Sequence, residues 1–317
     1  MTHTTVLVGT TKGAFLLSGT PEGDGWSVAG PFCDGWPINH MGGDPQTGRI
    51  WAVGGNDWFG AGVWRSGDGS DWTLAKLADG QMDDWVRNDP DTAKLLGVTA
   101  QPPAPFTGRL DALWSVRHTP QALYAGSKPA RLFRSTDGGE TWAEMTGLTD
   151  HPSSDSWQPG AVGLTLHSIV TVPDAPEKIW VAISAAGGFR RSNAPATPSS
   201  HPASGDGIET GHCVHNLQHA PGDGDLLYQQ NHHGVFRSRD GGRSWDEITD
   251  GLPSTFGFPI GVHPRDPGTI WTLPLNGDTE GRYPPEASAA VWRSRDGGES
   301  WHACRDGLPQ TSCFFTV

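Results

Sequence analysis

Histidines in strand-like segments are the residues of this sequence best suited to chemistry. His40, His167 and His215 each stand five or six residues before a proline, although His40 is one residue out of step with the other two. His232 follows in the stretch 229–233, which reads Gln-Gln-Asn-His-His. Imidazoles from separate strands can bind a divalent metal such as Zn, Mn or Fe and leave coordination positions open for water or substrate. We therefore expect His40, His167, His215 and His232 to be metal ligands, with His167, His215 and His232 taking part in catalysis.

A short phrase that ends in tryptophan predicts the elements that position these histidines. Full copies occupy 135–142, 238–245 and 294–301, and a shortened copy occupies 66–72. In each copy an aspartate follows a serine by two positions, where its carboxylate can accept hydrogen bonds from the following N–H groups. The glycines beside it tolerate positive φ. Because a strand-like run ends directly before each copy, the phrase predicts a tight hairpin whose base the tryptophan covers.

The phrase, which reads STDGGETW at 135–142, resembles the Asp-box, or bacterial neuraminidase repeat, S-x-D-x-G-x-[ST]-W. The resemblance implies a sialidase-like β-propeller, one of the WD40/YVTN-like repeat folds, in which the box joins the third and fourth strands of a blade. Degenerate copies are expected to end at Trp26 and near position 199, so that box ends are about 46 to about 70 residues apart, which is compatible with propeller repeats. We therefore predict an all-β fold, a single β-propeller domain over 1–317 with six four-stranded blades.

The two ends of the sequence predict how the ring of blades closes. Segments 5–10, 13–17 and 26–30 are typical of the second, third and fourth strands of a blade, and 313–317 could supply its inner strand. Strand exchange between the termini would remove the exposed edges of an open array. A truncated seven-bladed propeller, cut short after the first strand of its last blade, stays the alternative.

Composition and charge narrow the class of protein and its partners. The 44 glycines, 26 prolines and 35% hydrophobic residues are typical of short strands and tight turns rather than long helices. A net charge of −13 predicts a surface that repels nucleic acid and anionic membranes. No signal peptide or membrane-spanning run is evident, and the 4 cysteines are irregularly spaced for a disulfide framework. We therefore expect a cytoplasmic protein with no nucleic-acid partner and no membrane partner.

The sequence lacks several features that the resemblance would require for sialidase activity. Sialidases bind the substrate carboxylate with three arginines and use a tyrosine paired with glutamate as nucleophile. Tyr124 and Tyr228 fall in strand-like segments, and Tyr283, in a loop beside Arg282, has no assignable glutamate. The F/Y-R-I-P segment that carries the first sialidase arginine is absent from the N-terminal part. Classical sialidase activity is therefore not expected, while Arg282 and Tyr283 remain candidate catalytic residues.

Aromatic and polar residues outside the repeat pattern are candidate substrate contacts. Most of the 15 tryptophans close a box or lie in the strands before one, so we assign them to the fold. The candidates that remain, together with polar residues near the histidines, are Trp58, Trp114, Trp157, Gln158, Gln230 and Asn231.

Three classes of function stay open. The first is an enzyme that acts on a carbohydrate or polar small molecule at the mouth of the central channel, as a metal-dependent lyase or hydrolase. The second is a non-catalytic protein-interaction or assembly-factor scaffold, and the third is a sugar-binding module without turnover. The histidines could also hydrogen-bond a polar, water-filled channel, or act as acid and base without a metal.

Overall fold

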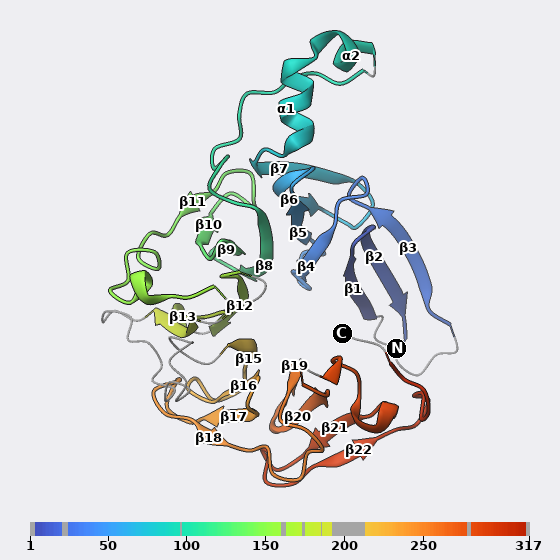
Figure 1. Ribbon diagram of the computed structural model, residues 1–317, viewed down its shortest axis with the longest axis vertical. Helices are drawn as coiled ribbons and strands as arrows, with labels where there is room; N and C mark the ends of the chain where they lie inside the picture. The colour runs from blue at the N-terminus through green and yellow to red at the C-terminus, as the bar shows by residue number, and fades with distance from the viewer. Residues whose placement is uncertain are drawn as a thin grey trace. The chain divides into compact units, whose positions relative to one another are not determined.

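The computed structural model describes residues 4–20, 25–95, 97–159, 163–172, 175–184, 186–191, 213–277 and 280–314. The chain divides into two compact units, Met1–Asp150 and His151–Val317. Each unit contains three antiparallel sheets and is described by itself (Figure 1). The predicted single domain stays a prediction.

The first unit contains sheets in which the strands follow one another in chain order. Its first sheet has β1 (Thr4–Thr10), β2 (Gly13–Gly19) and β3 (Ser27–Phe32). The second has β4 (Ile38–Gly43), β5 (Ile50–Asn56), β6 (Gly60–Ser66) and β7 (Trp72–Ala78). The third has β8 (Ala112–Thr119), β9 (Ala122–Lys128), β10 (Leu132–Ser135) and β11 (Ala143–Glu144). Two short helices, α1 (Gln81–Asn88) and α2 (Pro90–Leu95), follow β7 and extend away from its sheet (Figure 1).

The second unit repeats this arrangement. Its first sheet has β12 (Leu166–Val172), β13 (Ala175–Ile183) and β14 (Gly187–Arg191). The next has β15 (Val214–His219), β16 (Leu227–Asn231), β17 (Val235–Ser238) and β18 (Asp246–Glu247). The last has β19 (Gly257–His263), β20 (Asp266–Pro274), β21 (Val291–Ser294) and β22 (His302–Cys304). Single 3-10 turns occupy Ser154–Ser156 and Pro285–Ala287.

The six sheets are propeller blades. Within each unit the first strands of neighbouring sheets lie against one another, as β4 does with β8 and β15 does with β19. Sheets of consecutive antiparallel strands that meet along their first strands are typical of a propeller. The fold is therefore an all-β, six-bladed β-propeller with four-stranded blades, which confirms the predicted fold class.

Two blades show three strands in the part of the chain that the structure describes, β1–β3 and β12–β14. The degenerate box expected near position 199 and residues 315–317 of the expected closing strand lie outside the described residues. Within the second unit, Cys313 donates its backbone N–H to the Ala287 carbonyl at 2.9 Å. Closure of the ring by strand exchange stays a prediction.

The predicted box hairpins are present. In the copy at 135–142, the Asp137 carboxylate accepts hydrogen bonds from the N–H groups of Glu140 and Thr141, both at 3.0 Å. Gly138 and Gly139 take φ values of 78° and 97°. The shortened box uses the same contacts, since Asp68 accepts from the Ser70 N–H at 2.9 Å. The shortened box is one residue shorter than the others, but its aspartate still accepts a hydrogen bond from the backbone of the turn.

Tryptophans on the second strands tie one blade to the box of the next. Trp51 of β5 is 3% exposed and donates its Nε1–H to the Gly138 carbonyl at 2.9 Å. Trp180 of β13 donates in the same way to Gly241 at 2.9 Å. The apolar core lies where neighbouring blades pack together, and we call these contacts the blade seams. The seam at Trp51 also contains Val63, Leu113 and Phe133. The assignment of these tryptophans to the fold is confirmed.

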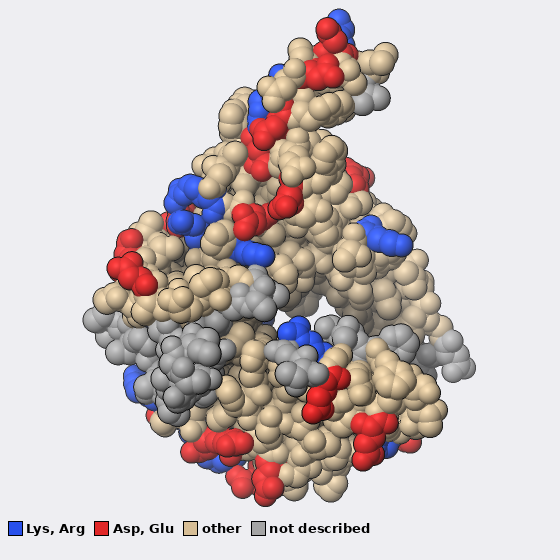
Figure 2. Space-filling view, in the orientation of Figure 1, with Lys and Arg blue, Asp and Glu red and all other residues tan. Residues whose placement is uncertain are grey.

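The surface carries the negative charge that the sequence predicts. Acidic side chains form several separate groups on the face seen in Figure 2. Among the described residues, no helix has both the length and the apolar character needed to cross a membrane.

Candidate functional site

An irregularity in the first strands decides where the predicted histidines point. All of these strands except β1 have one residue more than their partner over the same stretch, which is a β-bulge. In the second unit the extra residues are His167 in β12, His215 in β15 and one residue of the pair Phe258–Pro259 in β19. Bulges re-aim side chains, so His167 and His215 leave the alternating pattern of their strands.

The first unit has the same bulges with different side chains. Trp114 is the extra residue in β8, and the shift in β4 falls between Ile38 and His40, at Asn39. His40 therefore stands one position past the bulge, which matches its offset in the sequence. Its Nδ1 accepts a hydrogen bond from the Val116 N–H at 3.3 Å, and burial lowers its pKa.

Two predicted histidines, His215 and His232, meet in the second unit together with Cys213. The Cys213 sulfur and one imidazole nitrogen from each histidine lie within 4.8 Å of one another. We call these three residues the Cys-His-His cluster. It forms because Val214 of β15 pairs with Asn231 of β16, so that residues on either side of this pair converge at one end of the hairpin.

His215 is held in one tautomer by the next blade. Its Nδ1 lies 2.6 Å from the Gly257 carbonyl oxygen, which can only accept a hydrogen bond. In the neutral imidazole the proton is therefore on Nδ1, and Nε2 carries the lone pair. A backbone acceptor on one nitrogen is the usual way in which a metal-binding imidazole is oriented.

His232 is positioned by a buried polar turn. The Asn231 carboxamide oxygen accepts hydrogen bonds from the N–H groups of His233 at 2.7 Å and Gly234 at 3.1 Å. Gln230, 1% exposed, donates to the Gly234 carbonyl at 3.1 Å and the Thr255 carbonyl at 2.9 Å. Gln230 and Asn231, predicted as substrate contacts, thus support the turn that carries His232.

His167 lies beside the cluster without belonging to it. Burial lowers its pKa to about 3, the nearby His215 lowers it as well, and a backbone hydrogen bond at Val214 acts in the opposite direction. Its Nε2 is shielded from solvent and has no hydrogen-bond partner among the described residues. At neutral pH this imidazole is therefore uncharged.

Two phenylalanines line the cluster, and sequence reasoning missed both. Phe258 stacks on the His215 ring with centroids 4.6 Å apart, and Phe256 lies 5.3 Å from the His232 ring. We call these two rings the aromatic shelf. The Arg282 guanidinium carbon lies 5.5 Å from the Phe258 centroid and 5.9 Å from that of Phe256. The shelf thus connects a predicted catalytic arginine to the Cys-His-His cluster.

The other predicted site residues have contacts of their own. Tyr283 packs against Phe314, with ring centroids 5.1 Å apart. Trp157, 8% exposed, donates its Nε1–H to the Ser153 hydroxyl at 3.0 Å, and Gln158 beside it is exposed. Trp58, in the first unit, is 47% exposed in the turn between β5 and β6. The roles proposed for these residues remain untested predictions.

Cys213 stands two residues before His215 in the sequence. Because the bulge at His215 interrupts the alternation of side chains along the strand, this spacing alone could not predict that the two side chains meet. The phenylalanines had a weaker signal, because Phe258 occupies in β19 the position that His215 occupies in β15.

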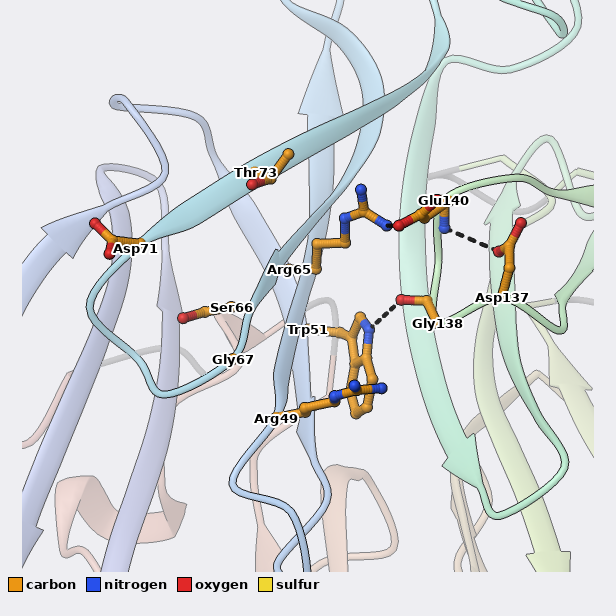
Figure 3. Close-up of a pocket in the computed structure, with 10 residues that line it drawn as sticks. All are labelled: Arg49, Trp51, Arg65, Ser66, Gly67, Asp71, Thr73, Asp137, Gly138 and Glu140. Carbon is orange, nitrogen blue, oxygen red and sulfur yellow. Dashed lines mark hydrogen bonds and ion pairs between the residues drawn. The ribbon is translucent and has the colours of Figure 1, made fainter.

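A separate hollow of about 390 Å³ opens between the second and third sheets of the first unit (Figure 3). Arg65 reaches across it to Glu140, with Nη1 and Oε1 3.1 Å apart, and Arg49 lies beside Trp51. The same contact recurs in the second unit, where Arg237 pairs with Glu299 at 3.1 Å. We therefore assign the hollow to the connection between blades.

Residues 133–144 match the family model of the BNR/Asp-box repeat. They comprise most of β10, the box hairpin with the Asp137 turn, and β11. The chain is a β-propeller that contains an Asp-box repeat. No curated protein sequence matches it.

This propeller is similar to solved structures whose sequences differ widely from it. YCF48 bound to a D1 peptide is 16% identical with a TM-score of 0.54, over 94% of this chain and 77% of that chain. The GH74 xyloglucanase from Xanthomonas campestris is 18% identical with a TM-score of 0.58, over 94% of this chain and 45% of that chain. A putative 6-phosphogluconolactonase from Bacteroides fragilis is 13% identical with a TM-score of 0.53, over 96% and 82%. At these identities the similarity concerns the fold alone.

Proposed function

We propose that the chain is a metal-dependent enzyme of the hydrolase or lyase type, which acts on a polar small molecule or carbohydrate at the Cys-His-His cluster. The observation that supports this proposal is the convergence of three metal-binding side chains within 4.8 Å. The proposed metal ligands differ from the four histidines expected from the sequence. Cys213 replaces His40 and His167 as a ligand, and His215 and His232 are kept.

The donor atoms favour zinc over manganese. A thiolate and two imidazoles suit zinc, whereas manganese prefers oxygen ligands. Zinc with three protein ligands keeps a fourth position open, where it lowers the pKa of a bound water and polarises a substrate oxygen. The neutral Nε2 of His215 and the thiolate of Cys213 would be the donors, and the Gly257 carbonyl would orient the His215 ring.

The state of the cysteines supports a cytoplasmic location. Cys33, Cys213, Cys304 and Cys313 are not joined in disulfides. Reducing compartments keep thiols in this form, and a thiolate ligand requires it. We therefore keep the cytoplasm as the proposed location.

The experiment measures zinc in protein purified without a histidine tag, after chelation and reconstitution with zinc alone. His215→Asn is the informative variant, because asparagine can still donate to the Gly257 carbonyl but is a poor zinc ligand. We expect about one zinc per chain in the wild type and at least about tenfold weaker binding in His215→Asn and His232→Ala.

His302→Ala serves as the control, since His302 is exposed on β22 of the same unit. It should bind zinc like the wild type. Failure of the reconstituted wild type to bind zinc, or equal binding by all four proteins, would overturn the metal proposal.

A protein-binding scaffold is the second candidate. It is favoured by the similarity in fold to YCF48, whose solved structure contains a peptide. Carbohydrate partners are favoured in the same way by the similarity to the GH74 xyloglucanase. A protein partner retained equally by the wild type and by His215→Asn would favour the scaffold.

A further inference from the structure

We infer that Arg282 and the aromatic shelf form an anion-binding subsite, so that the substrate carries a carboxylate or phosphate group next to the bond that reacts. This inference rests on the proposed function, because it places the anion beside the Cys-His-His cluster. It names the chemical class of the substrate, which the cluster alone leaves open.

Arg282 is connected to the cluster through two ring contacts. The guanidinium lies over Phe256 and Phe258, at 5.9 Å and 5.5 Å from their centroids. The same rings contact the two histidines, since Phe258 stacks on His215 at 4.6 Å and Phe256 lies 5.3 Å from His232. Arg282 and the two histidines of the cluster therefore contact the same pair of aromatic rings.

The shelf gives the guanidinium the surroundings of a recognition site. Phenyl faces attract a cation and hold its plane in place. They also lower the local dielectric constant, so that an ion pair formed beside them is stronger than one in water. The guanidinium has five N–H donors in a rigid planar fork, a geometry that matches two oxygens of a carboxylate or phosphate.

The backbone at Arg282 is strained in a way that suits a functional residue. Arg282 has a φ of 55°, in the left-handed region that favours glycine or asparagine. Its loop is fixed by the hydrogen bond from the Asn276 N–H to the Tyr283 carbonyl at 2.8 Å. Strained residues held by their surroundings are concentrated at binding sites. Arg282 contacts the shelf while Tyr283, the next residue, packs on Phe314.

Charge also distinguishes this place from the rest of the molecule. The chain has a net charge of −13. Zinc bound by one thiolate and two neutral imidazoles keeps a net positive charge, and Arg282 adds a second. A cationic site in an acidic protein attracts anionic ligands and discriminates against neutral ones.

The test compares ligands that differ only in charge. Binding of glucuronate, glucose and inorganic phosphate to the zinc-loaded protein is measured by titration calorimetry, in the wild type and in two Arg282 variants. Arg282→Gln removes the charge, and Arg282→Gly removes it while relieving the strained φ. We expect glucuronate or phosphate to bind at least about tenfold more weakly to both variants, and glucose to bind weakly and equally to all proteins.

Arg239→Gln is the control variant, because Arg239 is exposed and pairs with Asp246 at 3.1 Å on the same unit. It should bind the anions like the wild type. Loss of glucuronate binding alone identifies a carboxylate, and loss of phosphate binding alone identifies a phosphate. Anion binding that is unaffected by Arg282→Gln and Arg282→Gly, or absent from the wild type, would overturn the subsite.

Zinc content measured on the same samples separates the two proposals. Zinc bound normally by Arg282→Gln without any effect on anions would remove the subsite and leave the metal site. Anion binding that depends on Arg282 in a wild type that takes up no zinc would remove the metal site and leave the subsite.

Discussion

His215 donates its Nδ1 proton to the Gly257 carbonyl, 2.6 Å away in the next blade. Asn39 makes the equivalent bond in the first unit, where its Nδ2 donates to the Leu113 carbonyl at 2.8 Å. In both cases the donor is at the bulge of one first strand, and the acceptor stands directly before the bulge of the next. His215 therefore serves both the fold, through Nδ1, and the candidate site, through Nε2.

The shared bond predicts that metal binding and stability respond differently to two substitutions. His215→Ala leaves the Gly257 carbonyl without its donor and should lower the free energy of unfolding by about 1 to 2 kcal/mol. His215→Asn should change it by less than about 0.5 kcal/mol, since asparagine makes this bond at position 39. Urea unfolding of both chelated variants is the measurement, and equal losses in the two would contradict the shared role.

The space around Gly257 predicts that the blade seam tolerates no larger residue at this position. A Cβ at Gly257 would lie 2.9 Å from the Leu273 carbonyl oxygen and 3.2 Å from Cδ of Gln230. Gly257→Ala should therefore destabilise the fold by about 1 to 3 kcal/mol and, by displacing Gln230, weaken zinc binding at His232. Gly261→Ala on the same strand is the control, because a Cβ there meets nothing within 4 Å. Similar unfolding curves for the two variants would show that the seam can relax.

The boxes predict a dependence of stability on pH. Burial raises the pKa of Asp240, but hydrogen bonds from Ser244, Ser238 and Arg243 outweigh this effect and lower it to about 2. The unfolded value is about 4, so the carboxylate stabilises the fold above about pH 4, and this contribution is lost as the pH falls towards 2. Asp240→Asn should cost about 1 kcal/mol at neutral pH and less in acid.

Urea unfolding between neutral pH and about pH 3 measures this difference, with Asp250→Asn, at an exposed position, as the control. A cost for Asp240→Asn that stays constant over the whole range would mean that the charge of Asp240 is unimportant.

The arginines that precede the boxes are expected to contribute unequally to the stability of the blade seams. Arg237 has a side chain that is 7% exposed, and its Nη1 donates to the Gly297 carbonyl at 2.7 Å and to Glu299 at 3.1 Å. Arg237→Ala should lower the free energy of unfolding by about 2 to 3 kcal/mol, because the Gly297 carbonyl loses a charged donor. Arg65→Ala should cost less than about 1 kcal/mol, since Arg65 pairs with a largely exposed Glu140. Thermal or urea unfolding that ranks the two in the opposite order would contradict the argument.

The fold could be predicted from the sequence because the contacts that define its repeat are local. The box at 135–142 contains, within eight residues, both partners of the hydrogen bonds that shape its turn. The strands predicted at 5–10, 13–17 and 26–30 are present as β1, β2 and β3. Short-range contacts of this kind can be read from residue types and their spacing.

The candidate site was only half predictable because its contacts are long-range. The constant spacing of His167 and His215 from a following proline identified both as candidates, because both stand at the bulge of their strands. It could not bring together Cys213 and His232, because their approach depends on the pairing of Val214 with Asn231. Phe256 and Phe258 belong to the next blade and have no chemistry of their own, so nothing in their type marked them.

The bulges at the starts of the first strands have a consequence for how such a protein can change. In five blades the extra position holds a different kind of side chain in almost every case: Asn39, Trp114, His167, His215 and the Phe258–Pro259 pair. The antiparallel pairing of the first and second strands continues on both sides of this position. A single substitution per blade could thus exchange one reactive group for another while the scaffold stays intact, so that new activities can evolve on this fold one position at a time.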